Sequence, residues 1–422
     1  MLIEVNYGYV RSQEIVIHFC GRPVDVGQSP GQLNSYWVIM RASIMHFIII
    51  VVLLFAAINY YIGLRGWQAF HRWLPGWGYW TVFILLAGAY LAGRFLERAF
   101  PQSPASILTI IGSYWLGFMY YALLLVVLID IVRLLYRWWH FIPANVLHSP
   151  QWVGVAGVSL LLLIMSYGIW NALHPIVRHY DLTIDKDGGD YRTFHAVLVT
   201  DIHLGRIVNA RRLAGLVERV NALHPDVVLL GGDTIDEDVG PFAEQQMPAI
   251  FQRLNAPLGC YAIFGNHEYL GGQAEEAARC IRDAHIIVLR DQTTLVANSF
   301  YLVGRDDLSS RRTTHRRRAA LSDLLQGIER NRPIIMLDHQ PFHLEEAEEA
   351  GVDLQLSGHT HRGQLYPNNY ITHAVFEDDW GYLRKGACQF IVSCGYGTWG
   401  PPLRTGNTPE IVDMTIHFRK KS

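Results

Sequence analysis

The sequence predicts a bundle of apolar helices followed by an α/β domain. At 422 residues the chain is too long for one ordinary core, so more than one domain is expected. Hydrophobic residues make up 50% of the sequence and charged residues only 17%, which indicates that part of the chain faces lipid. Beyond Tyr180 acidic residues become frequent, and short apolar runs alternate with polar helical segments, a pattern typical of α/β domains.

Residues 1–40 show no regular apolar pattern, because residues such as Gly8 and Pro23 interrupt it. No basic segment is followed at once by an apolar core, so an ordinary cleaved signal sequence is not expected. Two explanations stay open: the segment is poorly ordered, or the true start is Met40 or Met45. No function is predicted for it.

Four long apolar runs follow, and each approaches or exceeds the roughly 17–25 residues that cross a bilayer. They are Ile44–Ile62, Trp77–Gly93, Ile107–Ile129 and Val153–Ala172. Aromatic residues gather at their ends, as in the interfacial belts of spanning helices. A buried soluble bundle is the alternative, but such helices seldom stay uncharged for so long. Residues 41–175 are therefore predicted to be a membrane anchor with four transmembrane helices.

The charged residues of this region lie near the ends of the runs. Asp130 ends the third run close to Arg133, which predicts an interfacial ion pair rather than a functional acid inside the membrane. Four spans place both chain ends on the same side. That side holds Arg41, Arg94, Arg98, Arg178, Lys186 and Arg192, and the other side holds Arg65, Arg72, Arg133 and Arg137. The excess predicts that the C-terminal domain is cytoplasmic.

The rest of the chain is expected to comprise a connector, residues 176–190, and an α/β domain, residues 191–422. Expected strands are Phe194–Thr200, Val227–Leu230, Gly259–Phe264, Thr294–Val296, Phe300–Val303, Ile334–Leu337, Leu354–Leu356, Gln389–Val392 and Ile411–Phe418. Expected helices are Ala210–Leu223, Phe242–Leu254 and Gln273–Ala284. The five cysteines show no Cys-x-x-Cys spacing, which argues against a disulfide framework and a thiolate zinc site.

Metal-competent residues follow several of these strands. They are Asp201 and His203, then Asp233, Asn266, His339, and finally His359 and His361. In an extended segment, side chains two residues apart point the same way, so Asp201 and His203 converge on one point. Strand ends of one sheet lie close together, and this number of oxygen and nitrogen donors suits two first-row metals that share one carboxylate. The sequence therefore predicts a two-metal site at this edge.

The ordered motifs resemble those of the calcineurin-like metallophosphoesterase superfamily. They are Asp201-x-His203, Gly232-Asp233, Gly265-Asn266-His267-Glu268, His339 and Gly358-His359-Thr360-His361, and the resemblance extends from Phe194 to Phe418. The segment Gly395–Arg404, with Pro409-Glu410 after it, is similar to the bacterial membrane-associated branch. The resemblance implies a four-layer sandwich of two mixed sheets flanked by helices.

The resemblance also implies residue roles. One metal would be held by Asp201, His203, Asp233 and His361, and the second by Asp233, Asn266, His339 and His359. His267 would be the catalytic acid or the group that stabilises the phosphate, and Glu268 would orient a neighbour. Arg362 departs from the branch pattern, because a glycine is usual there. Arg362 and Arg404 are predicted substrate contacts, with a loop-capping role as the alternative for Arg362.

The implied reaction is hydrolysis of a phosphomonoester, phosphodiester or pyrophosphate. Two divalent metals, manganese with iron or zinc as alternatives, would hold a bridging hydroxide that attacks phosphorus. Two other readings stay open: a catalytically inactive membrane sensor or scaffold, and a phosphoprotein phosphatase.

The expected partners are the lipid bilayer and a phosphate-containing substrate. The short connector would keep the site close to the headgroups, which favours a lipid-linked substrate; the pyrophosphate of UDP-diacylglucosamine is one family-level candidate. A net charge of -2 gives no reason to expect nucleic acid. The predicted location is the bacterial inner (plasma) membrane, as a multi-pass protein, and the oligomeric state is left open.

Overall fold

The computed structural model describes residues 17–19, 22–24, 30–100, 105–139, 149–314 and 317–419. Most of the predictions for residues 1–40 therefore lie outside the described residues. The chain forms two compact units. The helical unit comprises Leu2–Ala87 and Met119–Gly157, and the catalytic unit comprises Gly88–Phe118 and Val158–Ser422 together with Met1.

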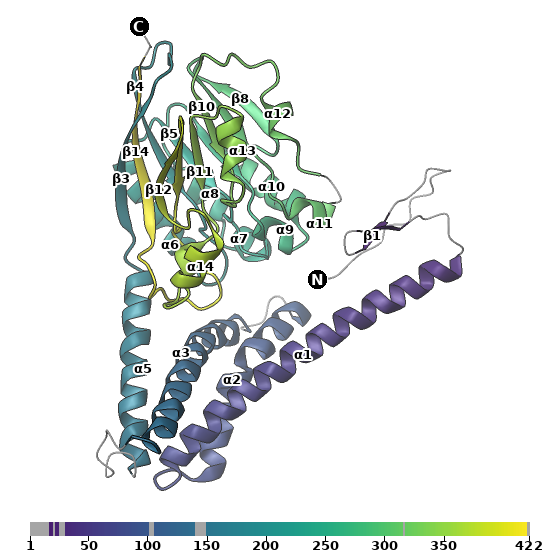
Figure 1. The fold of residues 1–422 in the computed structure, drawn as a ribbon, viewed down its shortest axis with the longest axis vertical. Coiled ribbons are helices and arrows are strands. Elements are labelled where there is room, and N and C mark those ends of the chain that lie inside the picture. Colours follow the sequence, from purple (N-terminus) through teal and green to yellow (C-terminus); the bar gives the residue numbers. More distant parts are fainter. Residues whose placement is uncertain are drawn as a thin grey trace. The chain divides into compact units, whose positions relative to one another are not determined.

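Four helices are long and apolar enough to cross a membrane, as the sequence predicts. They are α1 (Pro30–Phe70), α2 (Gly76–Ala99), α3 (Ser106–Tyr136) and α5 (Pro150–Ala172), labelled in Figure 1. Only 11–17% of their most apolar windows is buried within the protein, so most of these side chains are available to lipid. The helices of the N-terminal half are those of a membrane protein.

Within the helical unit, Asp130 lies in a polar cluster rather than alone. Its carboxylate accepts hydrogen bonds from Arg65 Nη2 and Tyr61 Oη, both at 2.5 Å, and lies 3.4 Å from Arg133 Nη1. A carboxylate with two arginine partners is paired, as the sequence indicates, and Arg65 adds a partner from a different helix.

The catalytic unit contains two six-stranded mixed sheets. One has the order β12 (Gly381–Lys385), β13 (Cys388–Val392), β11 (Leu354–Ser357), β10 (Ile334–Leu337), β9 (Phe300–Gly304), β8 (Gln292–Val296). The other has the order β3 (Ile176–Ile184), β14 (Glu410–Phe418), β4 (Thr193–Val199), β5 (Val227–Gly231), β6 (Cys260–Ile263), β7 (Ile287–Val288). Four adjacent strands of each sheet run parallel to one another: β4, β5, β6 and β7 in one sheet, and β9, β10, β11 and β13 in the other. The ends of several strands that precede predicted ligands therefore point the same way.

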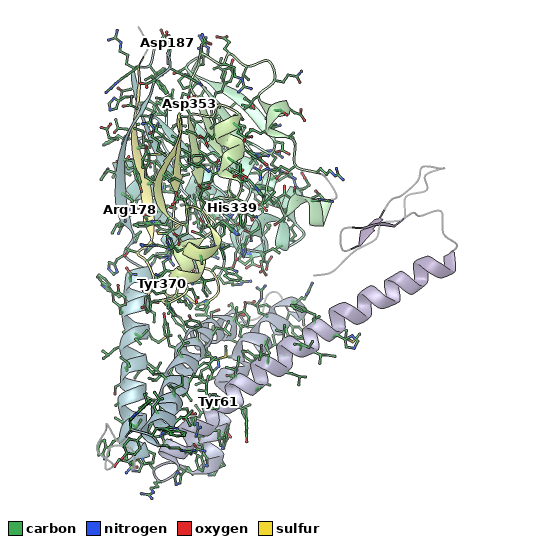
Figure 2. All side chains as sticks on the ribbon, in the orientation of Figure 1. Tyr61, Arg178, Asp187, His339, Asp353 and Tyr370 are labelled. Atoms are coloured by element: carbon green, nitrogen blue, oxygen red, sulfur yellow. The ribbon has the colours of Figure 1, made fainter. Side chains whose placement is uncertain are left out.

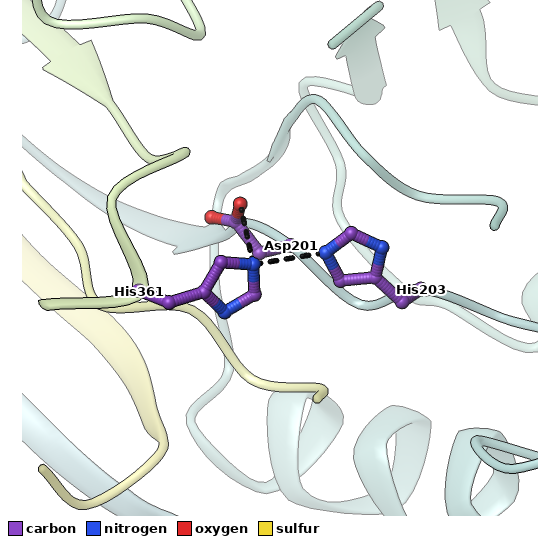
Figure 3. A group of neighbouring side chains, drawn as sticks. All are labelled: Asp201, His203 and His361. Atoms are coloured by element: carbon purple, nitrogen blue, oxygen red, sulfur yellow. Dashed lines mark hydrogen bonds and ion pairs between the residues drawn. The ribbon is translucent and has the colours of Figure 1, made fainter. Parts of the chain in front are cut away.

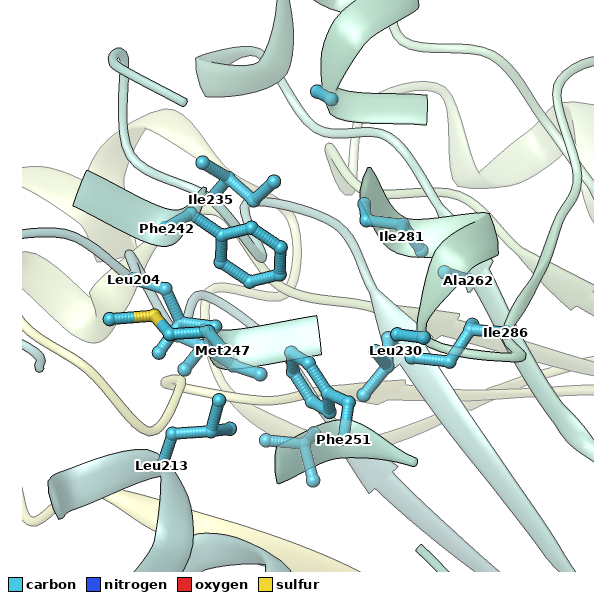
Figure 4. Packing of buried hydrophobic residues seen from close by; sticks show 14 of the residues in the cluster. Leu204, Leu213, Leu230, Ile235, Phe242, Met247, Phe251, Ala262, Ile281 and Ile286 are labelled. Atoms are coloured by element: carbon cyan, nitrogen blue, oxygen red, sulfur yellow. The ribbon is translucent and has the colours of Figure 1, made fainter. Parts of the chain in front are cut away.

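Helices cover the outer faces of both sheets, and a hydrophobic core fills the space between them. The inner core includes Leu198 of β4 and Leu337 of β10. The second sheet is covered by α6 (Ala210–Ala222), α7 (Gly240–Glu244), α8 (Met247–Phe251) and α10 (Ala274–Asp283), whose packing is shown in Figure 4. The first sheet is covered by α12 (Leu321–Leu324) and α13 (Leu344–Glu349). The expected four-layer sandwich is confirmed.

The remaining elements are short. They are β1 (Ile17–Phe19), β2 (Arg22–Val24), α9 (His267–Leu270), α11 (Ser310–Thr314), η1 (His361–Gly363) and α14 (Asn369–Val375).

Two expected elements differ from those observed. Phe242–Leu254 forms two helices, because Gln246 adopts a left-handed φ of +53° between α7 and α8. The connector contains β3, whose nine residues pair in parallel with β14. The segment after α5 is thus part of the sheet.

Candidate metal centre

Asp201, His203 and His361 form one group of ligand-type side chains. Asp201 and His203 follow β4, and His361 follows β11. His203 Nε2 lies 2.9 Å from His361 Nε2, which lies 3.4 Å from Asp201 Oδ1 (Figure 3). All three are buried. Two imidazole nitrogens and a carboxylate oxygen therefore converge on one buried point.

Asp233, His339 and His359 form a second group. His339 Nε2 lies 3.2 Å from Asp233 Oδ2, and its Nδ1 lies 2.9 Å from the carbonyl oxygen of Gly231, which fixes the orientation of the ring. Asp233 Oδ2 is also 3.9 Å from His203 Nε2 of the first group. The carboxylate of Asp233 therefore faces donors of both groups, which is the position expected for a carboxylate that two metals share.

The polar atoms of this site fit divalent metals. Among the described residues of the predicted ligand set, the amide oxygen Oδ1 of Asn266 is buried without a hydrogen-bond partner. Buried polar atoms ordinarily have partners, so this oxygen fits a bound cation. Imidazole, carboxylate and amide donors suit manganese, iron and zinc.

The electrostatics of the histidines differ between the two groups. Burial, with the charges of His203 and Arg404, lowers the pKa of His361 well below its usual value, so this ring is neutral. Burial opposes protonation of His339 too, but the contact with Asp233 outweighs it and raises the pKa of His339. A ligand imidazole must be unprotonated, so metal binding at His339 is expected to release a proton.

The backbone at this site is strained. Left-handed φ values occur at Asp201 (+51°), His203 (+52°), Asp233 (+50°), His359 (+72°) and His361 (+45°). Such conformations are uncommon for residues with a side chain and persist where the surrounding structure enforces them. Five of the seven predicted ligands share this feature, which supports a functional role for the cluster.

Glycines allow the ligands to approach one another. A Cβ on Gly265 would lie 2.2 Å from Asp233 Oδ1, and one on Gly358 would lie 2.3 Å from Asp201 Oδ2. Both contacts are closer than carbon and oxygen tolerate, so neither position accepts a side chain without displacement of a carboxylate.

His267 lies beside the two groups and pairs with Asp236. Its Nδ1 is 3.1 Å from Asp236 Oδ1, an atom that also lies 3.7 Å from His203 Nδ1. The Asp236 side chain is 43% exposed, but its Oδ1 atom is buried between the two rings. Burial opposes the imidazolium, whereas Asp236 and Asp233 raise the pKa of His267 to about 9.

Glu268 is a buried support of the loops. Its carboxylate accepts hydrogen bonds from the backbone N–H groups of Asp233, Ile235 and Gly265, at 2.8–3.1 Å. These bonds hold the loop after β5 against the loop after β6, which agrees with an orienting role.

The two arginines proposed as substrate contacts have different surroundings. The guanidinium carbon of Arg362 lies 4.0 Å from the centre of the Trp380 ring, and the side chain is partly exposed. Arg404 is fully buried. It donates to the carbonyl oxygens of Cys394 and Gly397, and its Nη2 is 3.2 Å from His361 Nδ1. This arrangement favours a positioning role for Arg404 over a substrate contact.

Sequence reasoning missed Asp236, Asn407 and Asn171. The only sequence signal for Asp236 is an acidic residue three positions after Asp233 in a loop that follows a strand. Asn407 donates to the His361 carbonyl oxygen, and Asn171 of α5 donates to the Arg404 carbonyl oxygen at 3.0 Å. Both are isolated asparagines outside any motif.

Comparisons with known proteins show which chains this one is similar to. The model of the calcineurin-like phosphoesterase family matches residues 194–363. An uncharacterized metallophosphoesterase of Aquifex aeolicus is 34% identical over 245 residues, which is 57% of this chain and 91% of that protein. A transmembrane protein with metallophosphoesterase domain from Danio rerio is 29% identical over 275 residues, which is 62% of each chain. Among solved structures, a dimetal phosphatase from Danio rerio is 14% identical and has a TM-score of 0.33. The aligned region is 53% of this chain and 98% of the phosphatase chain.

The fold and the site define a metal-dependent phosphoester hydrolase, and the histidine and aspartate clusters imply divalent metals. The chain belongs to the calcineurin-like metallophosphoesterases.

Proposed function

We propose that this chain is a membrane-anchored phosphoesterase that hydrolyses a phosphomonoester, phosphodiester or pyrophosphate bond. The observation that carries the proposal is the position of Asp233 Oδ2, 3.2 Å from His339 Nε2 and 3.9 Å from His203 Nε2. A carboxylate between two buried groups of nitrogen and oxygen donors suits a pair of metals with one shared ligand.

The seven predicted ligands divide into two sets. Asp201, His203, Asp233 and His361 would hold one metal, and Asp233, Asn266, His339 and His359 would hold the other. When bound, two divalent ions supply Lewis acidity and lower the pKa of water so that it can act as a nucleophile near neutral pH. Manganese is the proposed metal, with iron and zinc as alternatives.

His267 would supply the proton to the leaving oxygen. Because its Nδ1 faces Asp236 Oδ1 at 3.1 Å, its proton for the substrate would be held at Nε2. The His267 ring also packs edge-on against Trp399, with centroids 5.8 Å apart, which limits its rotation. Asp236 acts through His267 and His203 and is a positioning residue.

The proposed substrate is lipid-linked, because α5 ends at Ala172 and β3 of the catalytic sheet begins at Ile176. A UDP-diacylglucosamine-type pyrophosphate is one candidate, and a phosphoprotein is the alternative. Arg362 is a proposed substrate contact. We also propose a membrane anchor over residues 41–175 and a phosphoesterase domain over residues 191–422, to which β3 of the segment 176–190 adds an edge strand. The site is proposed to lie on the cytoplasmic side of a bacterial inner membrane.

The test is hydrolysis by the full chain in detergent after manganese loading. We expect cleavage of a generic aryl phosphodiester or monoester, about two metals per chain, and loss of activity with a chelator. Asp233→Ala and His267→Ala should reduce turnover, with Asp238→Ala, an exposed residue of the same loop, as the control.

Full activity in Asp233→Ala would overturn the mechanism. Less than about one bound metal per chain would instead favour the inactive sensor or scaffold. A screen of phosphoproteins and membrane lipid extract, with release of phosphate or nucleotide as the readout, separates the substrate classes. A topology reporter fused after Ser422 tests the cytoplasmic placement, which an extracytoplasmic signal would contradict.

A further inference from the structure

The short helix α14 presents a row of apolar side chains to solvent. Tyr370 is 63% exposed, Ile371 62% and Val375 60%. None of the seven residues of α14, all within the described part of the chain, is buried. We use the term α14 surface for Tyr370, Ile371, Ala374 and Val375. Exposed apolar side chains scattered singly are ordinary, but a contiguous patch marks an interaction site.

The opposite side of α14 is fixed to the domain by polar contacts. Thr372 Oγ1 donates to Asp379 Oδ2 at 2.6 Å, and Asp379 is itself buried in the domain. Residues 371 and 375 lie one turn apart and therefore share a face. The helix is thus held with its apolar side outward.

The α14 surface adjoins the metal centre. The ring of Phe376, the next residue in the chain, makes a tilted contact with the ring of Phe342, with centroids 4.7 Å apart, and its centroid lies 6.2 Å from that of the proposed ligand His359. His361, at the start of η1, precedes α14 by only a few residues. An apolar group lying on α14 would therefore be close to the site of phosphate chemistry.

The loop that leads into α14 is also linked to the end of the membrane helix α5. Tyr366 N donates to Thr405 Oγ1 at 3.0 Å, and Arg404 N donates to the carbonyl oxygen of Gly168 in α5 at 2.9 Å. A Cβ on Gly168 would lie 2.9 Å from Thr405 Cγ2, so the helix and the loop touch. Within the catalytic unit, Figure 1 shows α14 at the end of the domain from which α5 leaves, and Figure 2 labels Tyr370 there.

We propose that the α14 surface inserts into the interfacial region of the bilayer and brings the metal centre to the phosphate of a membrane lipid. This inference rests on the proposed function, because it explains how the lipid-linked substrate proposed for that site would reach the metal centre. Tyrosine and aliphatic side chains on one face of a helix suit the boundary between headgroups and acyl chains. The bilayer is favoured over a second protein, because α5 holds this surface beside the membrane at a high effective concentration.

A fluorescent label at Ile371→Cys tests the insertion directly. The full chain is placed in phosphatidylcholine–phosphatidylglycerol nanodiscs, and quenching by a lipid-borne quencher is compared with quenching by iodide. The matched control is Ile287→Cys on β7, a residue that is 50% exposed and belongs to the other sheet. Wild-type protein treated with the same label measures the background signal from the native cysteines.

We expect the lipid-borne quencher to act several-fold more strongly at position 371 than at 287, and iodide to show the reverse order. Equal quenching by iodide at both positions would overturn the inference. Protection of position 371 from both quenchers would also overturn it, because a protein surface would then cover α14.

Paired substrates separate this inference from the proposed function. The full chain is assayed on soluble bis-p-nitrophenyl phosphate and on vesicle-embedded dioleoylphosphatidyl-p-nitrophenol. Ile371→Ser/Val375→Ser should lower cleavage of the lipid about fivefold or more and leave the soluble activity within about twofold. Equal loss of activity on both substrates would contradict delivery of the lipid by α14.

Absence of any hydrolysis by wild type would contradict the proposed function. The labelling result would still decide whether α14 contacts the bilayer.

Discussion

At the scale of single residues, Asp236 supports two imidazoles with one carboxylate oxygen. Its Oδ1 lies 3.1 Å from His267 Nδ1 and 3.7 Å from His203 Nδ1. The same atom therefore influences a proposed acid and a proposed metal ligand, which makes Asp236 the most informative single position for mutation.

We expect Asp236→Asn to lower turnover about 10–100-fold. It should also move the alkaline limb of the pH profile to lower pH. Asp236 contributes to raising the pKa of His267 to about 9, so the proton needed for the leaving group is present below that value and lost above it. Removal of the negative charge lowers this pKa, and the active protonated form disappears at lower pH.

The measurement is a comparison of pH–rate profiles of wild type and Asp236→Asn with equal metal content. Asp238→Asn is the matched control, because Asp238 is exposed in the same loop. An unchanged alkaline limb in Asp236→Asn would argue against His267 as the acid.

Arg404→Lys should destabilise the protein by about 3 kcal/mol, because a lysine cannot make the forked hydrogen bonds of a buried guanidinium. Arg404 bonds Cys394, Gly397 and Asn407 and contacts His361, so manganese affinity should fall as well. Thermal unfolding with and without manganese tests this, with the exposed Arg211→Lys as the control. Unchanged stability with a raised KM would favour a substrate contact.

At the scale of elements, the proposed ligands follow the ends of strands, and glycines beside them allow the ligand side chains to approach one another. Gly265→Ala should reduce metal binding more than tenfold, because a methyl group there would lie 2.2 Å from Asp233 Oδ1 and 2.6 Å from His339 Nε2. Gly215→Ala in α6 has no atom within 4 Å of its methyl position, so it should stabilise the protein by about 0.5–1 kcal/mol. Metal titration and thermal unfolding of the two variants provide the check.

The strands that carry the ligands could be predicted from the sequence, because β4, β5, β6, β10 and β11 are short apolar runs that end at a polar residue. Strand β3 and helix α14 could not. Strand β3 forms by pairing with β14, which is remote in sequence, so the local sequence does not identify it. Helix α14 has only seven residues, too few for a helical period to be recognised. The sequence predicts Phe242–Leu254 as one helix, because the left-handed backbone at Gln246 does not change the spacing of the apolar residues.

At the scale of the whole molecule, the anchor and the metal site are not independent within the catalytic unit. Asn171 of α5 is buried and donates to the carbonyl oxygens of Arg404 and Asn407, at 3.0 and 2.6 Å. Arg404 and Asn407 contact His361 in turn. Sequence periodicity assigns residue 171 to the end of a span, but it does not show that the span ends against the loop that holds a ligand.

Asn171→Ala should therefore weaken manganese binding several-fold and lower stability by about 1–3 kcal/mol, because the carbonyl groups of Arg404 and Asn407 lose a donor. Leu163→Ala on the same helix is the control, since Leu163 is 69% exposed. Metal titration of both full-length variants in detergent would reveal the difference. Equal affinities would show that the loop holds His361 without help from α5.

The position of β14 in its sheet has a consequence for biosynthesis. Strand β3 follows α5 closely in the chain and lies at the edge of the sheet, and β14 separates it from β4. The ribosome makes α5 and β3 long before it makes residues 410–418, so the backbone groups of β3 stay without their sheet partner during that interval. An unpaired strand held at a membrane surface is prone to aggregation, so the nascent chain is expected to need a chaperone until β14 closes the sheet.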